Sequence, residues 1–254
     1  MNIQKLLPKV VEIAEDAGRV LLEQQSKARE LKTDEDFLTT ADLKSDKYIT
    51  YKLKELNPDI PIYSEEKETG IKNIKGLFWI VDPLDGTINY FRQDNFWGVS
   101  IALVQNQKTQ MGVVYLPGLN QLAAVTINGD AILKGVKLSV NSESSLAKAQ
   151  IWTEWTKKGP VSTLLILEKL ARISLYPQIR LCCSASLTRV ASGRISGYIH
   201  PQPGIEDFAA GCLIVEKAGG KVTDLEGKPW TPFSKSIIAS NGLIHKQLLE
   251  ATNP

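Results

Sequence analysis

The sequence predicts a layered fold of helices and strands, with an α+β first half and an α/β second half. Two observations carry this prediction. Helical spacing of apolar residues gives way to a run of strand-like segments, and after about residue 145 strands alternate with helices. The 254 residues suffice for one large domain or two tightly packed halves. We therefore expect halves at 1–145 and 146–254, with a soft boundary between Asn141 and Lys148.

The first half is expected to begin with two helices and to continue as a series of strands. Apolar residues at helical spacing predict one long amphipathic helix in the first thirty residues; they are Leu6, Val10, Ile13, Ala14, Ala17, Val20 and Leu21. A second helix is predicted from about Asp42 to Leu56, because Asn57 and Pro58 end it. Apolar segments between turn residues then predict strands at 60–64, 76–81, 97–104, 111–116 and 121–127.

The second half is expected to alternate between the two kinds of element. The pattern predicts strands at 149–155, 178–183 and 236–241, and helices at 160–173, 184–193 and 205–220 with one more at the C-terminus. Two glycines, Gly219 and Gly220, close the helix at 205–220. This alternation is typical of a layered α/β arrangement.

Composition and charge exclude several classes of protein. The chain is 43% hydrophobic and 23% charged, which is typical of a soluble globular protein. Its longest apolar runs fall far short of the ~18 to 20 residues of a bilayer span, and Glu12, Glu15 and Asp16 stand where a signal peptide is uniformly apolar. We therefore expect a cytoplasmic protein. The net charge is +2 and basic residues are scattered, so neither a nucleic-acid nor a membrane partner is expected.

Cysteine and histidine are too sparse to carry the chemistry. Cys182 and Cys183 are adjacent, Cys212 stands alone, and the absence of CxxC spacing argues against both a disulfide framework and a zinc site. We interpret the three as small core residues. His200 and His245 are too far apart in sequence for an imidazole metal site. Any metal chemistry must therefore rest mainly on oxygen ligands.

The stretch WIVDPLDGTINYF, residues 79–91, joins an apolar run to paired acids. If a buried strand ends here, it ends because Pro83 has no N–H group to donate to the β-ladder, and Asp82 is left at the open end of the strand. Asp85 follows three residues later, and two converging carboxylates repel unless a cation or a shared proton lies between them. An ordinary turn with solvated acids explains this spacing equally well.

Gly86 and Thr87 come directly after these acids. Gly86 permits a close approach of the backbone, and Thr87 is predicted to cap a short helix that runs to Tyr90. The free N–H groups at the start of such a helix form a phosphate site.

Other acids lie where elements begin or end. Glu65 and Glu66 follow the strand IPIYS, Asp207 lies in the first turn of a strongly apolar helix, and Asp42 lies just ahead of the second helix. Read singly, the first two suit a solvated loop, and the other two suit helix capping.

Four motifs together resemble the inositol monophosphatase family. They are TTAD with Asp42, SEE with Glu65, the DPLDGTINY run, and the EDFAAGxxIxxxAGG run with Asp207, and they span nearly the whole chain in the order of that family. The family belongs to the magnesium-dependent, lithium-sensitive phosphatase superfamily, together with fructose 1,6-bisphosphatases and 3'(2'),5'-bisphosphate nucleotidases. The resemblance implies a layered αβαβα sandwich, a homodimer and inhibition by lithium.

The resemblance also implies roles for individual residues. Two or three Mg²⁺ ions are expected on Glu65, Asp82, the carbonyl of Leu84, Asp85 and Asp207. The catalytic residues are expected to be Glu65, Thr87 and Asp42, with the Thr87 hydroxyl oriented by Asp42 to position the attacking water. Phosphate and substrate are expected to contact Asp85, Gly86, Thr87, Ala185, His200 and Asp207. Glu66 has a supporting role at most.

The chain departs from the family pattern at the predicted substrate rim. Glu206 replaces a tryptophan, His200 replaces a glutamate that contacts substrate hydroxyls, and Cys183 replaces a glycine. These changes argue against inositol 1-phosphate and are compatible with a substrate that has a second anionic group or fewer hydroxyls, since an imidazole lacks the acceptor pair of a carboxylate and adds positive charge at low pH. His200 is alternatively a strand-end residue without a ligand contact.

The leading hypothesis is a magnesium-dependent phosphomonoesterase for a small sugar or polyol phosphate, acting through direct attack of a metal-activated water. Within the class, the SEE form of the acidic motif suits a 3'(2'),5'-bisphosphate nucleotidase, whereas the continuation INY suits an inositol phosphatase, and we give INY more weight. A non-catalytic regulatory protein on the same fold is the alternative from another class. A pure binding protein has no physical need to keep all the predicted metal acids.

Overall fold

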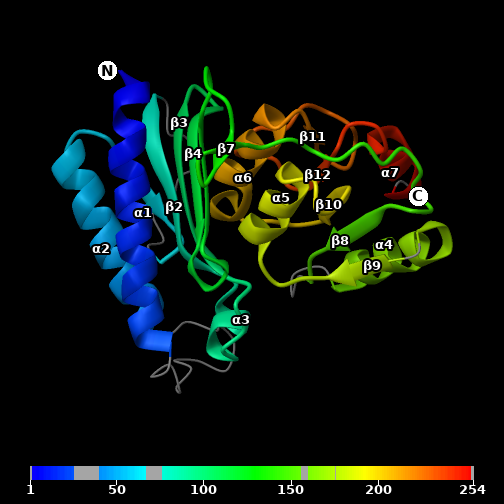
Figure 1. Ribbon diagram of the computed structural model, residues 1–254, viewed down its shortest axis with the longest axis horizontal. Helices are drawn as coiled ribbons and strands as arrows, with labels where there is room; N and C mark the ends of the chain where they lie inside the picture. The colour runs from blue at the N-terminus through cyan, green and yellow to red at the C-terminus, as the bar shows by residue number, and fades with distance from the viewer. Residues whose placement is uncertain (1, 26–39, 67–75, 156–159, 175, 253–254) are drawn as a thin grey trace.

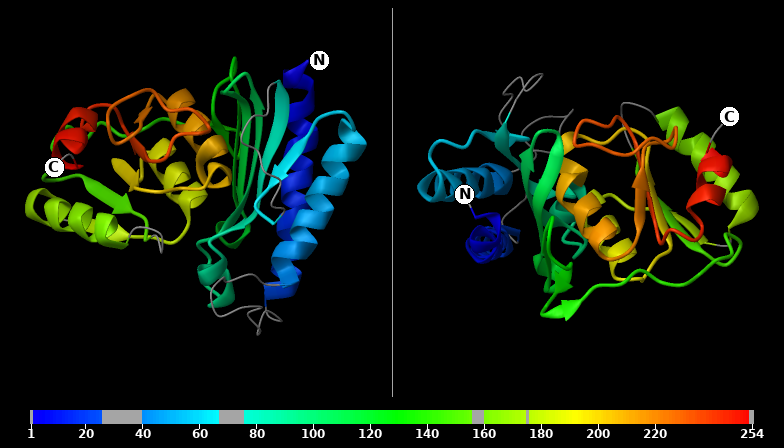
Figure 2. Two further views of the ribbon diagram at one scale, coloured as in Figure 1. Left: turned by 180° about the vertical axis from the view of Figure 1, so that it is seen from behind. Right: turned by 90° about the horizontal axis from the view of Figure 1, so that it is seen from above.

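The chain folds into alternating layers of helices and sheets (Figure 1) (Figure 2). The computed structural model describes residues 2–25, 40–66, 76–155, 160–174 and 176–252. Helices cover the outer face of a first sheet, lie between the first and second sheets, and cover the far face of the second sheet. In that order they are α1 (Ile3–Gln25) with α2 (Thr40–Leu56), α5 (Cys183–Ala191) with α6 (Ile205–Lys217), and α4 (Pro160–Ile173) with α7 (His245–Thr252). The predicted αβαβα sandwich is confirmed.

The first sheet follows the chain order of its strands. Its described strands are β1 (Ile62–Ser64), β2 (Leu77–Asp85), β3 (Gly98–Gln105), β4 (Lys108–Leu116), β5 (Gln121–Thr126), β6 (Ile132–Leu133) and β7 (Val136–Lys137). Only β1 and β2 pair in parallel, and every other neighbouring pair is antiparallel. The short helix α3 (Thr87–Phe91) follows β2, and a 3₁₀ turn at Pro117–Leu119 precedes β5.

The outer core lies between α1, α2 and this sheet. Of the apolar residues predicted for the first helix, Val10, Ile13, Ala14, Ala17 and Leu21 are buried, and Leu6 and Val20 are half-buried. All of these except Val20 pack with Ile49 and Leu53 of α2 and with Trp79 and Val81 of β2. Each fully buried aliphatic side chain contributes about 1.5–3 kcal/mol, so this face accounts for the stability of α1 on the sheet.

The middle layer brings the second half of the chain against the first sheet. Helix α6 contacts β2, β3 and β4, and α5 packs against α6. A Cβ atom at Gly112 of β4 would lie 2.7 Å from the Ala210 carbonyl oxygen, so only glycine lets the backbone of α6 come this close. This close contact positions the N-terminal turn of α6, with Asp207, near the end of β2.

The second sheet has a mixed topology. Among the described residues its order is β11 (Lys221–Thr223), β12 (Ile237–Ser240), β10 (Gly197–His200), β8 (Gln150–Thr153) and β9 (Tyr176–Ile179). Strand β8 runs parallel to β9 and β10, whereas β12 runs antiparallel to β10 and β11. The far face of this sheet packs Ile151, Ile199 and Ile238 against Leu170 of α4 and Leu248 of α7.

The strand predicted at 178–183 is wrong in its position. Strand β9 ends at Ile179, and Cys183 is the first residue of α5. The backbone N–H groups of Cys183 and Ser184 bond to the carboxylate of Asp85, which leaves them no part in a β-ladder. The short strands β6, β7, β10 and β11 were not predicted.

Three further sequence predictions concern the whole chain. All three cysteines are buried and free, which confirms their place in the core. None of the described helices is long and apolar enough to cross a membrane. The boundary between halves near residue 145 stays a prediction.

Candidate metal centre

Strand β2 continues past Pro83, contrary to the prediction that this proline ends it. Asp82 pairs with Ser100 of β3 and Asp85 pairs with Gly98, so one extra residue of β2 is accommodated between these pairs. This is a β-bulge, where a residue without an N–H costs no ladder hydrogen bond. Asp82 and Asp85 therefore lie on the two sides of a bulge within β2, whereas the sequence had predicted that the strand ends at Asp82.

Hydrogen bonds fix the backbone of the bulge. The Ser45 hydroxyl of α2 donates to the Pro83 carbonyl at 2.8 Å. The Leu84 N–H donates to the Asp82 carboxylate at 2.9 Å. Since Ser45, Asp82 and Leu84 are all buried, these bonds satisfy groups that water does not reach.

Three predicted metal ligands converge in space. Asp82, Asp85 and Asp207 each place a carboxylate oxygen within 4.8 Å of the other two. Asp82 and Asp85 are buried and Asp207 is half-buried. Glu65 lies beside this group, since its N–H donates to the Val81 carbonyl at 3.2 Å across the β1 and β2 pair. Carboxylate oxygens without imidazole or thiolate suit a hard cation such as Mg²⁺.

Asp207 both caps α6 and belongs to the carboxylate cluster. Its carboxylate accepts the Gly204 N–H at 2.6 Å, which satisfies a free amide at the start of the helix. Helix capping was one interpretation of this acid from the sequence and metal binding was another. The hydrogen bond agrees with the capping interpretation, and metal binding by Asp207 stays a prediction.

Burial and mutual repulsion disfavour ionised carboxylates in the cluster. Desolvation first, and then the charges of Glu65 and Asp85, raise the pKa of Asp82 well above its usual range. Desolvation and the charges of Glu206 and Asp85 do the same to the pKa of Asp207. Desolvation, Glu206 and Glu66 raise the pKa of Glu65 to about 8, although this residue keeps an exposed surface at the edge of the cluster. A bound divalent cation removes this repulsion, so the donor set fits a metal.

Asp85 is the best-satisfied acid of the cluster. It accepts the Cys183 N–H at 3.2 Å, the Ser184 N–H at 2.5 Å and the Cys182 thiol at 3.2 Å. Burial raises its pKa, and the hydrogen bonds from Ser184, Cys182 and Cys183 oppose that rise. The motif predicted Asp85, but the amides of α5 carry no sequence signal because backbone donors belong to every residue type.

Thr87 lies between two acceptors. Its hydroxyl is 3.1 Å from the Leu84 carbonyl and 3.3 Å from the Asp42 carboxylate, and one proton serves only one of them at a time. Thr87 is the first residue of α3, and the predicted cap position falls on Gly86 instead. Gly86 has φ of 87°, and a Cβ atom there would lie 3.0 Å from the carbonyl oxygens of Leu181 and Phe96.

The predicted substrate rim is more buried than the sequence indicated. Ala185 lies in the first turn of α5 and His200 ends β10, and both are buried. The His200 ring accepts the Gln202 N–H on Nδ1 at 3.3 Å, and desolvation lowers its pKa to about 3. Protonation of this imidazole, predicted at low pH, therefore requires more acidic conditions than an exposed histidine needs. Glu206 lies close enough to Glu65 and Asp207 to raise their pKa values.

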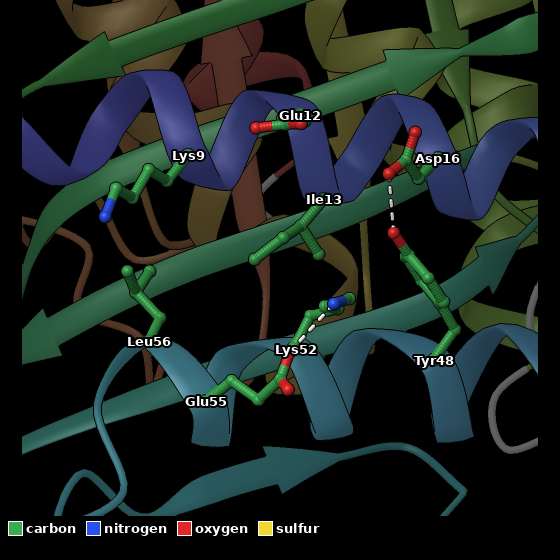
Figure 3. Close-up of a pocket in the computed structure, with 8 residues that line it drawn as sticks. All are labelled: Lys9, Glu12, Ile13, Asp16, Tyr48, Lys52, Glu55 and Leu56. Carbon is green, nitrogen blue, oxygen red and sulfur yellow. Dashed lines mark hydrogen bonds and ion pairs between the residues drawn. The ribbon is translucent and has the colours of Figure 1, made fainter.

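A groove lies between α1 and the C-terminal part of α2 (Figure 3). Its volume is about 380 Å³, and it is lined by charged side chains and Tyr48. The Lys52 ammonium pairs with Glu55 at 2.8 Å, and the Tyr48 hydroxyl donates to Asp16 at 2.6 Å. An ion pair within α2 and a hydrogen bond between α1 and α2 thus lie in this groove, and none of the predicted site residues lines it.

Comparison with known proteins agrees with the layered fold and the acidic motifs. Residues 2–254 match the inositol monophosphatase family, and the chain belongs to that family. A fructose-1,6-bisphosphatase/inositol-1-monophosphatase of Thermotoga maritima is 33% identical over 220 residues, which cover 86% of this chain and 83% of that protein.

Other relatives carry a different kind of name. A Nus factor SuhB of Xylella fastidiosa is 32% identical over 225 residues, which cover 86% of this chain and 81% of that protein. The solved structure of the extragenic suppressor protein suhB of Bartonella henselae matches with a TM-score of 0.89 and 32% identity, covering 96% of each chain.

Proposed function

We propose that the protein is a magnesium-dependent phosphomonoesterase that hydrolyses a small sugar or polyol phosphate. The observation that supports it most is the convergence of Asp82, Asp85 and Asp207, whose carboxylate oxygens lie within 4.8 Å of one another. Such a concentration of buried negative charge is costly unless a cation offsets it. Family membership supports the reaction class, and lithium inhibition follows from it as an expectation.

The residues that would hold two or three Mg²⁺ ions are Glu65, Asp82, Asp85, Asp207 and the carbonyl of Leu84. When bound, Mg²⁺ neutralises the phosphate and lowers the pKa of water. Carboxylate and carbonyl oxygens are the ligands that this ion prefers.

The remaining predicted residues would handle the water and the phosphate. The Thr87 hydroxyl, within reach of Asp42, would orient the attacking water, and Glu65 at the edge of the cluster would accept its proton. The amides of Gly86 and Thr87, at the start of α3, would bind phosphate oxygens. Direct attack of this water needs no covalent phosphoenzyme.

The rim supports a substrate with a single phosphate. His200 is neutral because burial lowers its pKa to about 3, so it supplies no cation for a second phosphate. Glu206 adds negative charge beside Asp207 and Glu65. Together these residues disfavour the bisphosphate nucleotidase reaction, in which the leaving group carries a second dianion.

A panel of phosphate esters tests this proposal. Release of inorganic phosphate is measured with and without Mg²⁺ from inositol 1-phosphate, other sugar phosphates and adenosine 3',5'-bisphosphate. We expect turnover of at least one single-phosphate ester and weaker turnover of the bisphosphate. A higher kcat/KM on the bisphosphate establishes the nucleotidase instead. No turnover of any ester, with Mg²⁺ bound normally, contradicts both phosphatase reactions.

Relatives named Nus factor SuhB favour a second candidate, a regulatory protein on the same fold. The variant Asp82→Asn, which removes charge from the cluster, distinguishes the two candidate functions. A phosphatase loses turnover in this variant. A regulator without catalytic function shows no turnover in either form.

The homodimer and the cytoplasmic location expected from the sequence stay predictions. Light scattering of the purified protein tests the first, with a mass of twice the 28.1 kDa of one chain as the expected result.

A further inference from the structure

One buried face of α2 carries three polar side chains. Asp42, Ser45 and Asp46 are spaced three and four residues apart, which sets them side by side on one face of the helix, and all three are buried. The carboxylate of Asp42 lies 3.3 Å from the Thr87 hydroxyl, and Ser45 donates to the Pro83 carbonyl. Asp46 is the member of this face that has no role in the proposed function.

Asp46 binds the residue that precedes Glu65. Its carboxylate accepts the Ser64 hydroxyl at 2.5 Å. The two residues are 4% and 1% exposed, so this hydrogen bond is shielded from water. Ser64 is the last residue of β1 and the first residue of the SEE motif. The bond thus joins α2 to the segment that supplies one of the proposed metal ligands.

The pleat of β1 connects the orientation of Ser64 with that of Glu65. Successive side chains of a strand point to opposite faces of the sheet. Ile62 packs in the core beneath α1 and α2, whereas Tyr63 packs in the core of the middle layer. By the same alternation Ser64 points toward α2, and Glu65 points toward the middle layer, where desolvation and the charge of Glu206 raise its pKa. Fixing the Ser64 side chain therefore fixes the face on which Glu65 is presented.

Strand β1 has few other attachments at this end. It has three residues, and among the described strands it pairs only with β2, because it lies at the edge of the sheet. The Glu65 N–H, which donates to the Val81 carbonyl at 3.2 Å, continues this pairing past Ser64. Short segments at the edge of a structure open more readily than its interior. The Ser64 hydroxyl supplies a second attachment beside this backbone bond.

We propose that Ser64 and Asp46 are a positioning pair that holds Glu65 in place for the metal and the attacking water. The proposal rests on the metal-dependent function proposed above. Asp46 thereby joins Asp42 and Ser45, so that α2 supports the end of β1, the bulge of β2 and the start of α3. Partners that orient metal ligands commonly contribute about 10- to 100-fold to metal affinity or activity.

Three measurements on the full chain test this pair: Mg²⁺ binding by isothermal titration, amide hydrogen exchange in EDTA, and steady-state kinetics. Ser64→Ala removes only the hydroxyl, and Tyr48→Phe is the matched control. Tyr48 lies two residues beyond Asp46 on α2, and its hydroxyl donates to the Asp16 carboxylate of α1 at 2.6 Å. The control therefore removes a bond of the same kind from the same helix, but one that leads to α1 and not to β1.

We expect the Glu65 amide of Ser64→Ala to exchange about 3- to 10-fold faster, because the end of β1 loses one hydrogen bond. Mg²⁺ binding should weaken by about 10-fold. At saturating Mg²⁺, kcat should fall by about 10-fold with little change in KM, since Glu65 is the proposed acceptor of the proton from water. Tyr48→Phe should match the wild type in all three measurements. A general loss of stability would not separate kcat from KM in this way.

A double variant tests whether Ser64 acts through Asp46. If it does, Ser64→Ala has little further effect on Mg²⁺ affinity once Asp46→Ala is present, because residues that act as a pair are not additive. Fully additive losses would show that the two residues act independently and would overturn the pair.

The proposal is also overturned if Ser64→Ala binds Mg²⁺ as tightly as the wild type, or if Tyr48→Phe weakens binding equally. Should Ser64→Ala fail to fold, wild-type Mg²⁺ affinity in Asp46→Ala overturns it. A wild type that binds Mg²⁺ but hydrolyses no ester contradicts the phosphatase, while the ratio of Mg²⁺ affinities between variants still tests the pair. A wild type that binds no Mg²⁺ contradicts the metal centre and this role of the pair together.

Discussion

Replacing Asp82 with asparagine should stabilise the cation-free protein and abolish its phosphatase activity. The carboxylate of Asp82 repels those of Asp85 and Asp207, and desolvation adds to the cost of its charge. Asparagine removes the charge but keeps an oxygen that accepts the Leu84 N–H, bonded at 2.9 Å in the native protein. The bulge is therefore retained while the metal site loses a ligand.

The size of the stabilisation follows from the separation of the acids. At the 4.8 Å that bounds the cluster, two unit charges repel by roughly 3.5 kcal/mol at an effective dielectric constant of about 20. Because the pKa values of Asp82 and Asp207 are raised, these acids bind protons and the cluster avoids part of this repulsion. We therefore expect a gain of about 1–3 kcal/mol, which corresponds to about 3–9 °C in melting temperature for a chain of this size.

The gain should also depend on pH. Raised pKa values mean that the native state binds more protons than the unfolded chain, so the stability of the wild type falls as pH rises through the shifted range. That range begins near the unfolded value of about 4 for a carboxyl group. Because Asp82→Asn removes one of these groups, its advantage over the wild type should be larger at about pH 8 than at about pH 5.

Thermal unfolding in EDTA at these two pH values measures the gain, and a second series with saturating Mg²⁺ measures the metal. The wild type should be stabilised by Mg²⁺ and the variant much less. Asp59→Asn is the matched control, since Asp59 is exposed in the turn before β1. A less stable cation-free variant, or an undiminished response to Mg²⁺, would refute the reasoning.

Three further substitutions probe the surroundings of the site. Gly86→Ala should lower the free energy of unfolding in urea by about 1–2 kcal/mol and should slow phosphate release, because φ is 87° and the added Cβ lies 3.0 Å from two carbonyl oxygens. Unchanged values of both would contradict this reasoning. Tyr90→Phe should lower the free energy of unfolding by about 1–2 kcal/mol, since the buried Tyr90 hydroxyl donates to the Leu21 carbonyl at 2.7 Å. Unchanged stability would mean that water replaces this hydrogen bond. His200→Gln should leave the pH profile of kcat/KM unchanged near neutrality, because the pKa of His200 is lowered to about 3; loss of a limb near pH 6.5 would show that this imidazole titrates there.

Patterns that repeat along the chain were predictable. Of the seven apolar residues that predicted the first helix, five are buried and two are half-buried, because helical spacing puts them on the one face that meets the sheet. The motif around Asp82 and Asp85 was equally informative, since paired acids after an apolar run are costly without a partner.

Features that depend on distant partners were not predictable. Pro83 looked like the end of a strand, but Ser45 and a bulge accommodate it, and neither is visible in the local sequence. Glu154 follows a strand just as Glu65 does, but its bond from the Tyr198 hydroxyl joins β8 to β10 across 44 residues of sequence, and nothing in the local pattern indicates it.

Phosphate release as a function of Mg²⁺ concentration, in the wild type and in Asp207→Asn, tests the central claim most directly. Asp207 comes from α6, whereas Asp82 and Asp85 come from β2, so the claim requires both segments to form one metal site. We expect saturable, Mg²⁺-dependent release from a single-phosphate ester in the wild type and a loss of about 100-fold or more in the variant. Release that is independent of Mg²⁺, or that persists unchanged in Asp207→Asn, would contradict the assignment.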